Sequence, residues 1–308
     1  MKSLLFFLIT FLTFQIYSQE QKVILITGSA SGIGKAAARS LIEKGYTVYG
    51  GDIQVEENLY LNDIGGYALI MDVTKDEQVN AGVNKVIDEQ GRIDVLINNA
   101  GYGSFATIEN INMDELKNQF DVNVFGYARL QQAVLPHMRK ERSGLIIEIS
   151  SVVGEISYPM LGWYAATKHA VEAMADALRQ EVSPFGIHVV KIQPGAVKTN
   201  FPNVALAKLE KSNIPEDYKQ LAQDFKLVVE GTYRDTAESL DGTVSSIIEV
   251  VEAEDQETEY RTTYSSRMAI KIKNSMGEKE HDQLNARQFK GAVNYLRSIK
   301  GNEKNNGE

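Results

Sequence analysis

The chain has 308 residues, a formal net charge of -9 and a pI near 5.2, and no stretch of it is rich in lysine and arginine. The acidic balance argues against nucleic-acid binding, and the absence of cysteine from the sequence excludes disulfides, thiol nucleophiles and cysteine-ligated metals. The histidines, His137, His169, His188 and His281, lack metal-ligand spacing, so no metal site is predicted.

Residues 1–18 consist of one early lysine and an apolar run that polar residues interrupt. The run is shorter than the ~20 residues that a membrane span needs, which favours a signal peptide over a short membrane anchor. Ser18 suits a signal-peptide cleavage site but Ile16 does not, so a retained membrane anchor stays an alternative. Two further alternatives are that these residues form a buried helix, or that the start of the chain has been assigned too far upstream. Localisation is left open, because a signal favours export or membrane association whereas a nucleotide cofactor favours the cytoplasmic side.

A glycine turn follows the first predicted strand. Residues 22–27 are apolar and β-branched, as in a buried parallel strand, and residues 35–44 have an alanine-rich helical pattern. Strand, glycine turn and helix together predict a phosphate-binding loop, because glycines admit a pyrophosphate close to the backbone and the helix adds the positive end of its dipole. The predicted binding positions are Gly28, Ser31, Gly32, Ile33 and Gly34.

Asp52 ends a second predicted strand, residues 47–51, about 20 residues beyond the glycine turn. At that position a carboxylate accepts hydrogen bonds from the adenosine ribose of NAD, and it would repel the additional phosphate of NADP by about 1 to 4 kcal/mol at ~4 Å. No lysine or arginine lies beside Asp52 or within the turn. NAD is therefore the predicted cofactor, with NADP as the alternative.

The alternation of strands and helices continues through residue 101. Residues 67–71 and 93–97 are predicted strands, and an amphipathic helix is expected over residues 76–90. This order predicts an α/β fold of the Rossmann type, a doubly wound parallel sheet of about seven strands in a single domain. Sheets of this type bind ligands at the carboxyl ends of their strands. The residues that follow these two strands are Asp72, Val73, Asn98, Asn99, Ala100 and Gly101.

Tyr164 and Lys168 lie four residues apart, which places them on one face of a helix. Lowering the pKa of a phenol by roughly three units takes about 4 kcal/mol, which a nearby cation and a low-dielectric site can supply. A phenol tuned in this way can exchange a proton with a carbonyl or an alcohol oxygen. Predicted strands at residues 144–149 and 188–192 bring Ser151, Pro194 and Gly195 to the same sheet edge.

Beyond Thr199 the pattern weakens, and residues 200–235 are interpreted as a substrate lid that contains a helix from about Glu216 to Val229. Further predictions are a helix over residues 236–251, an acidic loop over 252–259, a seventh strand over 259–264, one or two helices over 265–300 and a disordered tail over 301–308. Tyr102, Phe105, Tyr158, Trp163 and Phe201 suggest an apolar substrate pocket, although core packing explains some of them equally well.

Taken together, the motifs resemble those of the classical short-chain dehydrogenase/reductases, in the order of that family, from residue 22 to about 201. The matching residues are Thr27, Gly28, Gly32, Gly34, Asp72, Asn98 to Gly101, Asn123, Ser151, Tyr164, Lys168, Pro194, Gly195, Val197 and Thr199. Ser151 rather than Ser150 fits the family spacing of 13 residues before Tyr164.

The resemblance implies catalytic roles for Asn123, Ser151, Tyr164 and Lys168. Tyr164 would be the general acid/base, Lys168 would lower its pKa and hold the nicotinamide ribose, and Ser151 would hydrogen-bond the substrate oxygen. Asn123 would anchor a water that links the lysine to solvent. The cofactor-binding residues would be those of the glycine turn with Asp52, Asp72, Val73, Asn99, Ala100, Gly101, Tyr164, Lys168, Pro194, Gly195, Val197 and Thr199.

The leading hypothesis is an NAD-dependent oxidoreductase that interconverts a secondary alcohol and its ketone or aldehyde, with an apolar small-molecule substrate. The alternative is a nucleotide-binding scaffold or sensor that has kept the fold and lost turnover. Relatives often associate through the helices that carry Asn123 and Tyr164, so the resemblance also implies a homodimer or homotetramer.

Overall fold

The computed structural model describes residues 21–305, so the signal or anchor expected at residues 1–18 lies outside the described part. Seven parallel strands form one sheet in the order β3-β2-β1-β4-β5-β6-β7. The strands are β1 (Val23–Thr27), β2 (Thr47–Asp52), β3 (Tyr67–Ile70), β4 (Val95–Asn98), β5 (Gly144–Ile149), β6 (Ile187–Gln193) and β7 (Glu259–Arg261). The doubly wound sheet predicted from the sequence is confirmed.

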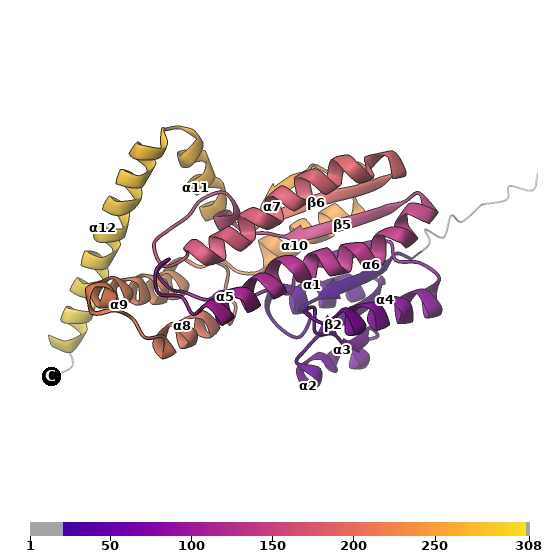
Figure 1. The fold of residues 1–308 in the computed structure, drawn as a ribbon, viewed down its shortest axis with the longest axis horizontal. Coiled ribbons are helices and arrows are strands. Elements are labelled where there is room, and N and C mark those ends of the chain that lie inside the picture. Colours follow the sequence, from indigo (N-terminus) through magenta and orange to yellow (C-terminus); the bar gives the residue numbers. More distant parts are fainter. Residues whose placement is uncertain (1–20, 306–308) are drawn as a thin grey trace, which may run out of the picture.

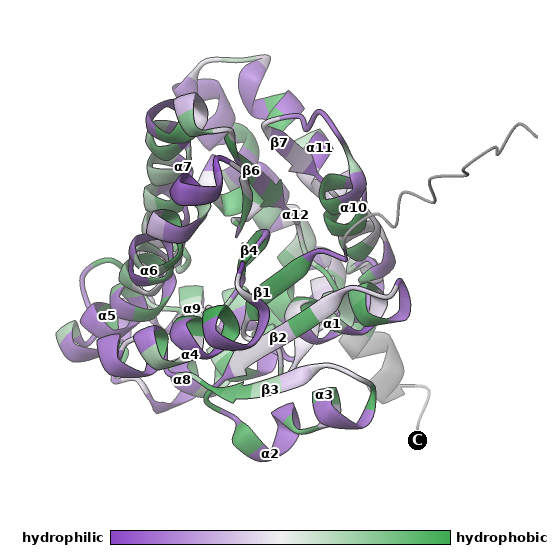
Figure 2. Ribbon diagram, turned by 90° about the vertical axis from the view of Figure 1, so that its right-hand side faces the viewer, coloured by the Kyte–Doolittle hydropathy of each residue, from purple (hydrophilic) through white to green (hydrophobic). Residues whose placement is uncertain are grey.

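Helices cover both faces of the sheet (Figure 1). The apolar side chains of α4 (Asp76–Gln90), α6 (Gly126–Glu141) and α7 (Gly162–Val182) pack on one face. Those of α1 (Gly32–Glu43) and α10 (Asp241–Glu252) pack on the other. Figure 2 shows the hydrophobic residues concentrated on central strands such as β1, as expected for parallel strands buried on both faces.

The remaining helices flank these layers or extend beyond the carboxyl ends of the strands. They are α2 (Val55–Asn58), α3 (Tyr60–Asp63), α5 (Met113–Phe120), α8 (Phe201–Lys211), α9 (Glu216–Gly231), α11 (Tyr264–Asn274) and α12 (Glu278–Asn305). Short helical turns of other types are Asp121–Phe125, Val152–Gly154, Ser183–Phe185 and Thr232–Thr236. None of the helices among residues 21–305 is both long and apolar enough to cross a membrane.

The sheet reverses its strand order between β1 and β4, and this position determines where the site lies. β1 pairs with β2 on one side and with β4 on the other, so the connections after β1 and β4 lead in opposite directions. A crevice opens at such a switch point beside the carboxyl ends of the strands. The glycine turn after β1 and the loop 98–101 after β4 therefore border one crevice.

Three element boundaries in the last third differ from the predictions. Strand β7 ends at Arg261 rather than near Tyr264, because the Thr263 side chain accepts from Ser266 N and begins α11. Helix α10 begins at Asp241 rather than at residue 236, because Glu238 pairs with the segment around Val197. A disordered tail was expected from residue 301, but helix α12 continues to Asn305. Residues 306–308 lie outside the described part of the chain.

Candidate active site

The glycine turn is shaped by close approach of backbone segments. Gly28 and Gly32 have φ of 69° and 55°, which favours glycine, and a Cβ on Gly28 would lie 2.9 Å from the Cα of Ala100. Asn99 Nδ2 donates to the carbonyl of Thr27 at 2.8 Å, which ties the loop after β4 to the turn. The Ser31 side chain makes no capping hydrogen bond to the first turn of α1. The N-terminus of α1 therefore keeps backbone N–H groups available for an anionic ligand.

Asp52 lies at the end of β2 against the same turn. Its Oδ2 accepts from Ala30 N at 2.9 Å, and its Oδ1 accepts from Gln54 N at 2.8 Å. The carboxylate is buried, yet it lines the cavity described below. Since a carboxylate offers about four lone-pair sites, both oxygens can accept further hydrogen bonds from a ribose.

A cavity of about 1330 Å³ joins the glycine turn to the Tyr164 helix. It is lined by nearly all of the predicted site residues: Gly28, Ser31, Gly32, Ile33, Asp52, Asp72, Val73, Asn99, Ala100, Gly101, Ser151, Tyr164, Lys168, Pro194, Gly195, Val197 and Thr199. Gly34 and Asn123 do not line it. A Cβ on Gly34 would lie 2.2 Å from the carbonyl oxygen of Gly28, so this glycine permits contact between α1 and the turn.

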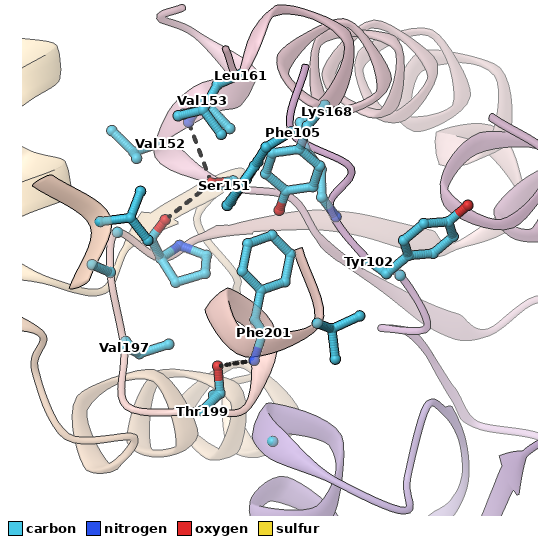
Figure 3. A pocket seen from close by; sticks show the side chains of 18 of the residues that line it. Tyr102, Phe105, Ser151, Val152, Val153, Leu161, Lys168, Val197, Thr199 and Phe201 are labelled. Atoms are coloured by element: carbon cyan, nitrogen blue, oxygen red, sulfur yellow. Dashed lines mark hydrogen bonds between the residues drawn. The ribbon is translucent and has the colours of Figure 1, made fainter. Parts of the chain in front are cut away.

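Ser151 and Tyr164 face each other in the cavity. The Ser151 hydroxyl donates to the carbonyl of Pro194 at 3.4 Å and accepts from Val153 N at 3.3 Å, as Figure 3 shows. Desolvation raises the pKa of the Tyr164 phenol, the Tyr233 phenol raises it further, and a hydrogen bond with Ser151 partly opposes both. The expected lowering of this pKa by Lys168 is therefore not found in the structure, in which desolvation by burial is the largest influence on the phenol. The phenol is neutral near pH 7.

Lys168 is buried in the wall of the cavity, and its ammonium contacts backbone and aromatic partners. Its Nζ donates to the carbonyl of Ile149 at 2.6 Å, which also accepts from the Tyr127 hydroxyl at 3.1 Å. Burial lowers the pKa of Lys168 to about 8, although the carboxylates of Glu148 and Glu172 act to raise it. At neutral pH the side chain is therefore mostly charged, one helical turn from Tyr164.

Asn123 lies in the π-helical turn Asp121–Phe125, between α5 and α6. Its side chain is fully buried, donates to the carbonyl of Tyr102 at 2.8 Å and to Thr167 Oγ1 at 3.1 Å, and accepts from Tyr102 N at 3.0 Å. The side-chain amide therefore joins the loop after β4 to α7. A water held by this side chain, as the family resemblance implies, would compete with these bonds.

Beyond the polar residues the cavity becomes apolar. Four of the five aromatic residues suggested by the sequence line it: Tyr102, Phe105, Tyr158 and Phe201. Trp163 does not, and its indole N–H donates to the carbonyl of Ile108 at 3.2 Å. In Figure 3, Phe105, Ser151, Lys168 and Phe201 point into a common space, whereas the Tyr102 hydroxyl points away from it.

The sequence predicted a substrate lid over residues 200–235 but no cavity residue of α9, and the contribution of α12 was missed. Phe225, Val229 and Tyr233 of the α9 region and Phe289 of α12 line the cavity. Their spacing of three or four residues marks one helical face and was the available signal. Among residues 21–305, no cluster of three or more histidine, aspartate or glutamate side chains is arranged to hold a metal ion.

The sequence matches the family model of the short chain dehydrogenases over residues 22–209. The chain belongs to the short-chain dehydrogenase family. This family match ends within α8, so α9 to α12 lie outside it. The chain is accordingly an oxidoreductase of this family.

Two relatives and one solved structure illustrate the similarity of this dehydrogenase to known proteins. It is 43% identical to the 3-ketodihydrosphingosine reductase of Bacteroides thetaiotaomicron over 200 residues, which cover 65% of this chain and 72% of the relative. It is 38% identical to the NADPH-dependent 3-dehydrocapnine reductase of Ornithobacterium rhinotracheale over 187 residues, or 57% of this chain and 65% of the relative. Its fold is similar to that of a short-chain dehydrogenase from Streptomyces avermitilis, with 27% identity, a TM-score of 0.73, and 92% and 99% of the two chains covered.

Proposed function

We propose that this dehydrogenase reduces a ketone to a secondary alcohol with a nicotinamide cofactor, and that it catalyses the reverse oxidation when the alcohol is in excess. The observation that carries the proposal is a single cavity bordered by the glycine turn at one end and by Ser151, Tyr164 and Lys168 at the other. The two relatives named as reductases of a 3-keto and a 3-dehydro compound support the direction of reduction.

The residues of the turn fit a dinucleotide. Gly28 and Gly32 line the cavity with backbone alone, the N-terminus of α1 attracts the charge of a pyrophosphate, and Asp52 can accept from a ribose hydroxyl. When bound, the cofactor supplies the hydride. Every other step falls to the side chains of the protein.

The proton comes from Tyr164 in this proposal. Its phenol is protonated at neutral pH because desolvation raises its pKa, which suits it to donate to a carbonyl oxygen. The Ser151 hydroxyl would hydrogen-bond the same oxygen and orient it. Lys168, charged below a pKa of about 8, would stabilise the phenolate that remains after proton transfer.

Asp52 favours NAD in this proposal, whereas two cations on α1 give NADP some support. Lys35 Nζ lies 4.4 Å from the centroid of the Tyr60 ring and Arg39 Cζ lies 4.8 Å from it, and the Tyr60 hydroxyl donates to Ser29 of the glycine turn. Neither cation lines the cavity. The sequence prediction considered neither residue, because both follow the turn on the helix.

Replacing Tyr164 by phenylalanine tests the mechanism, because the change removes only the hydroxyl. We expect kcat/KM for ketone reduction to fall by roughly 10² to 10⁴ while the Kd of the cofactor stays within a factor of three. Nicotinamide absorbance measures the first quantity and fluorescence titration the second. Tyr295→Phe, at a position 64% exposed on α12, is the matched control and should change neither. Full turnover in Tyr164→Phe would refute the assigned role.

A further inference from the structure

The cavity is larger than one ligand requires. Its volume of about 1330 Å³ exceeds the roughly 300 to 1,000 Å³ of a typical small-molecule pocket, so it can hold a second sizeable molecule beside a dinucleotide. The additional space lies between Tyr164 and the helices that follow the family match. We call this space the apolar compartment and define it by Phe105, Leu161, Phe201, Phe225, Val229 and Phe289.

The walls of the apolar compartment are hydrophobic and come mostly from a cluster separate from the two sheet cores. Phe105, Phe225 and Val229 are buried members of that cluster, and Phe289 packs against it while staying partly exposed. The cavity-lining stripe of α9 continues from Phe225 to Tyr233, a length of roughly 12 Å along the helix axis. An apolar group that lies along this stripe would contact the side chains of Phe225 and Val229 and the ring of Tyr233.

Helix α12 closes the far side of the compartment. It crosses α9 where a Cβ on Gly231 would lie 2.7 Å from Leu296, and Figure 1 shows it passing over the end of α9 and rising toward α11. Phe289 and Ala292 of α12 line the cavity beyond this crossing. Polar side chains border this apolar wall: Lys208, which pairs with Glu115 at 2.7 Å, and Asp282, Asn285 and Gln288 of α12 also line the cavity.

The aromatic rings around the compartment are inclined to one another. The Phe105 ring makes interplanar angles of 67° with Phe201 and 84° with Phe225, and the Tyr164 ring lies at 50° to Phe201. These pairs offer no parallel ring faces between which a flat aromatic ligand could stack. A flexible chain of methylene groups can instead follow the inclined surfaces.

We infer that the substrate is a ketone that carries a long unbranched aliphatic chain, and that α9 and α12 hold this chain in the apolar compartment. The inference rests on the proposed ketone reduction and specifies its substrate class. Three of the six defining side chains, Phe225, Val229 and Phe289, lie beyond residue 209, so the part of this protein that the family match does not cover supplies half of the compartment and takes part in chain recognition.

A chain-length series tests the inference with the full-length protein and NADH or NADPH. Initial rates with 2-butanone, 2-octanone and 2-dodecanone give kcat/KM for each ketone, and 3-ketodihydrosphingosine serves as a long-chain ketone with a polar head. We expect kcat/KM to rise about fourfold for each added methylene that becomes buried, until the compartment is filled. Equal values for 2-butanone and 2-dodecanone, or a clear preference for a fused-ring steroid ketone, would overturn the inference while leaving ketone reduction intact.

A pair of α12 variants locates the chain. Ala292→Trp adds a large side chain inside the compartment, whereas Asn294→Trp adds the same side chain at an exposed position that does not line the cavity. We expect Ala292→Trp to lower the ratio of kcat/KM for 2-dodecanone to that for 2-butanone at least tenfold, and Asn294→Trp to leave the ratio unchanged. An unchanged ratio in Ala292→Trp would overturn the inference.

A binding measurement separates this inference from the proposed function. Calorimetric titration of 2-dodecanone into the cofactor-loaded protein reports chain binding without turnover. Saturable binding that Ala292→Trp weakens, together with no turnover of any ketone, would support the compartment and refute the proposed function. No saturable binding would overturn the compartment whatever the activity.

Discussion

Asp52 is a carboxylate held in a fixed position at the cavity wall, and we propose that it discriminates between NAD and NADP. Hydrogen bonds from Ala30 N and Gln54 N hold both of its oxygens in place at the cavity wall. The cations of Lys35 and Arg39 lie on the ring of Tyr60 rather than beside this carboxylate. A 2′-phosphate placed next to Asp52 would therefore meet a fixed negative charge.

We expect Asp52→Asn to reduce discrimination against NADP. Asparagine keeps an acceptor oxygen but removes the charge, whose repulsion of a phosphate at ~4 Å amounts to about 1 to 4 kcal/mol. The ratio of the Kd of NADP to that of NAD should fall at least about tenfold, as measured by fluorescence titration. Asp63→Asn, at an exposed position on α3 that does not line the cavity, removes the same charge and should leave the ratio unchanged. Tighter binding of NADP than of NAD by the unmodified protein would contradict the argument.

Individual residues differed in how well the sequence revealed them. The glycine turn and the Tyr164–Lys168 pair were predictable because their chemistry demands fixed residue types at fixed spacing. The contacts of Asn123 were not, since a π-helical turn has no periodic signal. The raised pKa of Tyr164 was also missed, because it depends on burial and on the charge interaction with Tyr233, and both involve residues that are distant in sequence.

At the level of elements, the packing of α1 against the glycine turn depends on a glycine that does not line the cavity. Gly34 lies in the first turn of α1 and touches the carbonyl of Gly28 and the side chain of Asn99. Because Gly28 and Asn99 also line the cavity, the packing of this helix on the turn fixes the shape of the cavity at the proposed phosphate site. A change at Gly34 should therefore affect both folding and cofactor binding.

The variant Gly34→Ala tests this coupling. A Cβ would lie 2.2 Å from the oxygen of Gly28 and 2.5 Å from Asn99 Nδ2, so the turn must move. We expect a loss of about 1 to 3 kcal/mol in the free energy of unfolding and a cofactor Kd at least tenfold weaker. Gly291→Ala in α12, where a Cβ meets nothing within 4 Å, should instead stabilise the protein by up to about 1 kcal/mol. Urea unfolding and titration measure the two effects, and equal behaviour of the two variants would disprove the coupling.

Elements were predictable to different degrees along the chain. Helix α4 has the predicted bounds and β5 begins and ends as expected, because apolar periodicity and a following glycine or polar residue define them. Boundaries after residue 231 were less predictable, because the pairing of Glu238 with Val197 and the capping by Thr263 are tertiary and local side-chain effects. Helix α12 forms a wall of the cavity because it packs across α9. This contact joins residues that are distant in sequence, so no local sequence pattern predicts it.

Across the whole molecule, the layer between the sheet and the helices α6 and α7 contains buried charge as well as apolar packing. Glu148 on β5 is fully buried, and its Oε1 accepts from Asn98 Nδ2 and Gln131 Nε2, both at 3.0 Å. The charge of Lys168 on α7 acts to lower the pKa of Glu148. The neighbouring titratable groups in this layer are Tyr127 on α6, which Glu148 influences, and Glu172 on α7, which influences Lys168. Burial raises the pKa of Glu148 from 4.5 to about 7. Its ionisation therefore bears on the stability of the entire fold.

The sign of this effect follows from proton binding. The folded state holds the Glu148 proton more tightly than the unfolded state, so this group contributes stability below pH 4.5 that is lost as pH rises toward 7. A difference of about 2.5 units corresponds to about 3 kcal/mol. Glutamine at this position cannot ionise, and its amide oxygen can still accept from Asn98 Nδ2 and Gln131 Nε2.

We therefore expect Glu148→Gln to gain stability relative to the unmodified protein as pH rises from about 4.5 to 7.5, by up to about 3 kcal/mol in the free energy of unfolding. Urea unfolding at several pH values, followed by circular dichroism, measures the difference. Glu249→Gln, an exposed position on α10, makes the same change in net charge and should give a difference that is nearly independent of pH. If the curves for Glu148→Gln and the unmodified protein run parallel across this range, then Glu148 is ionised throughout, and the buried layer must hold a negative charge that its two amide donors and Lys168 are sufficient to stabilise.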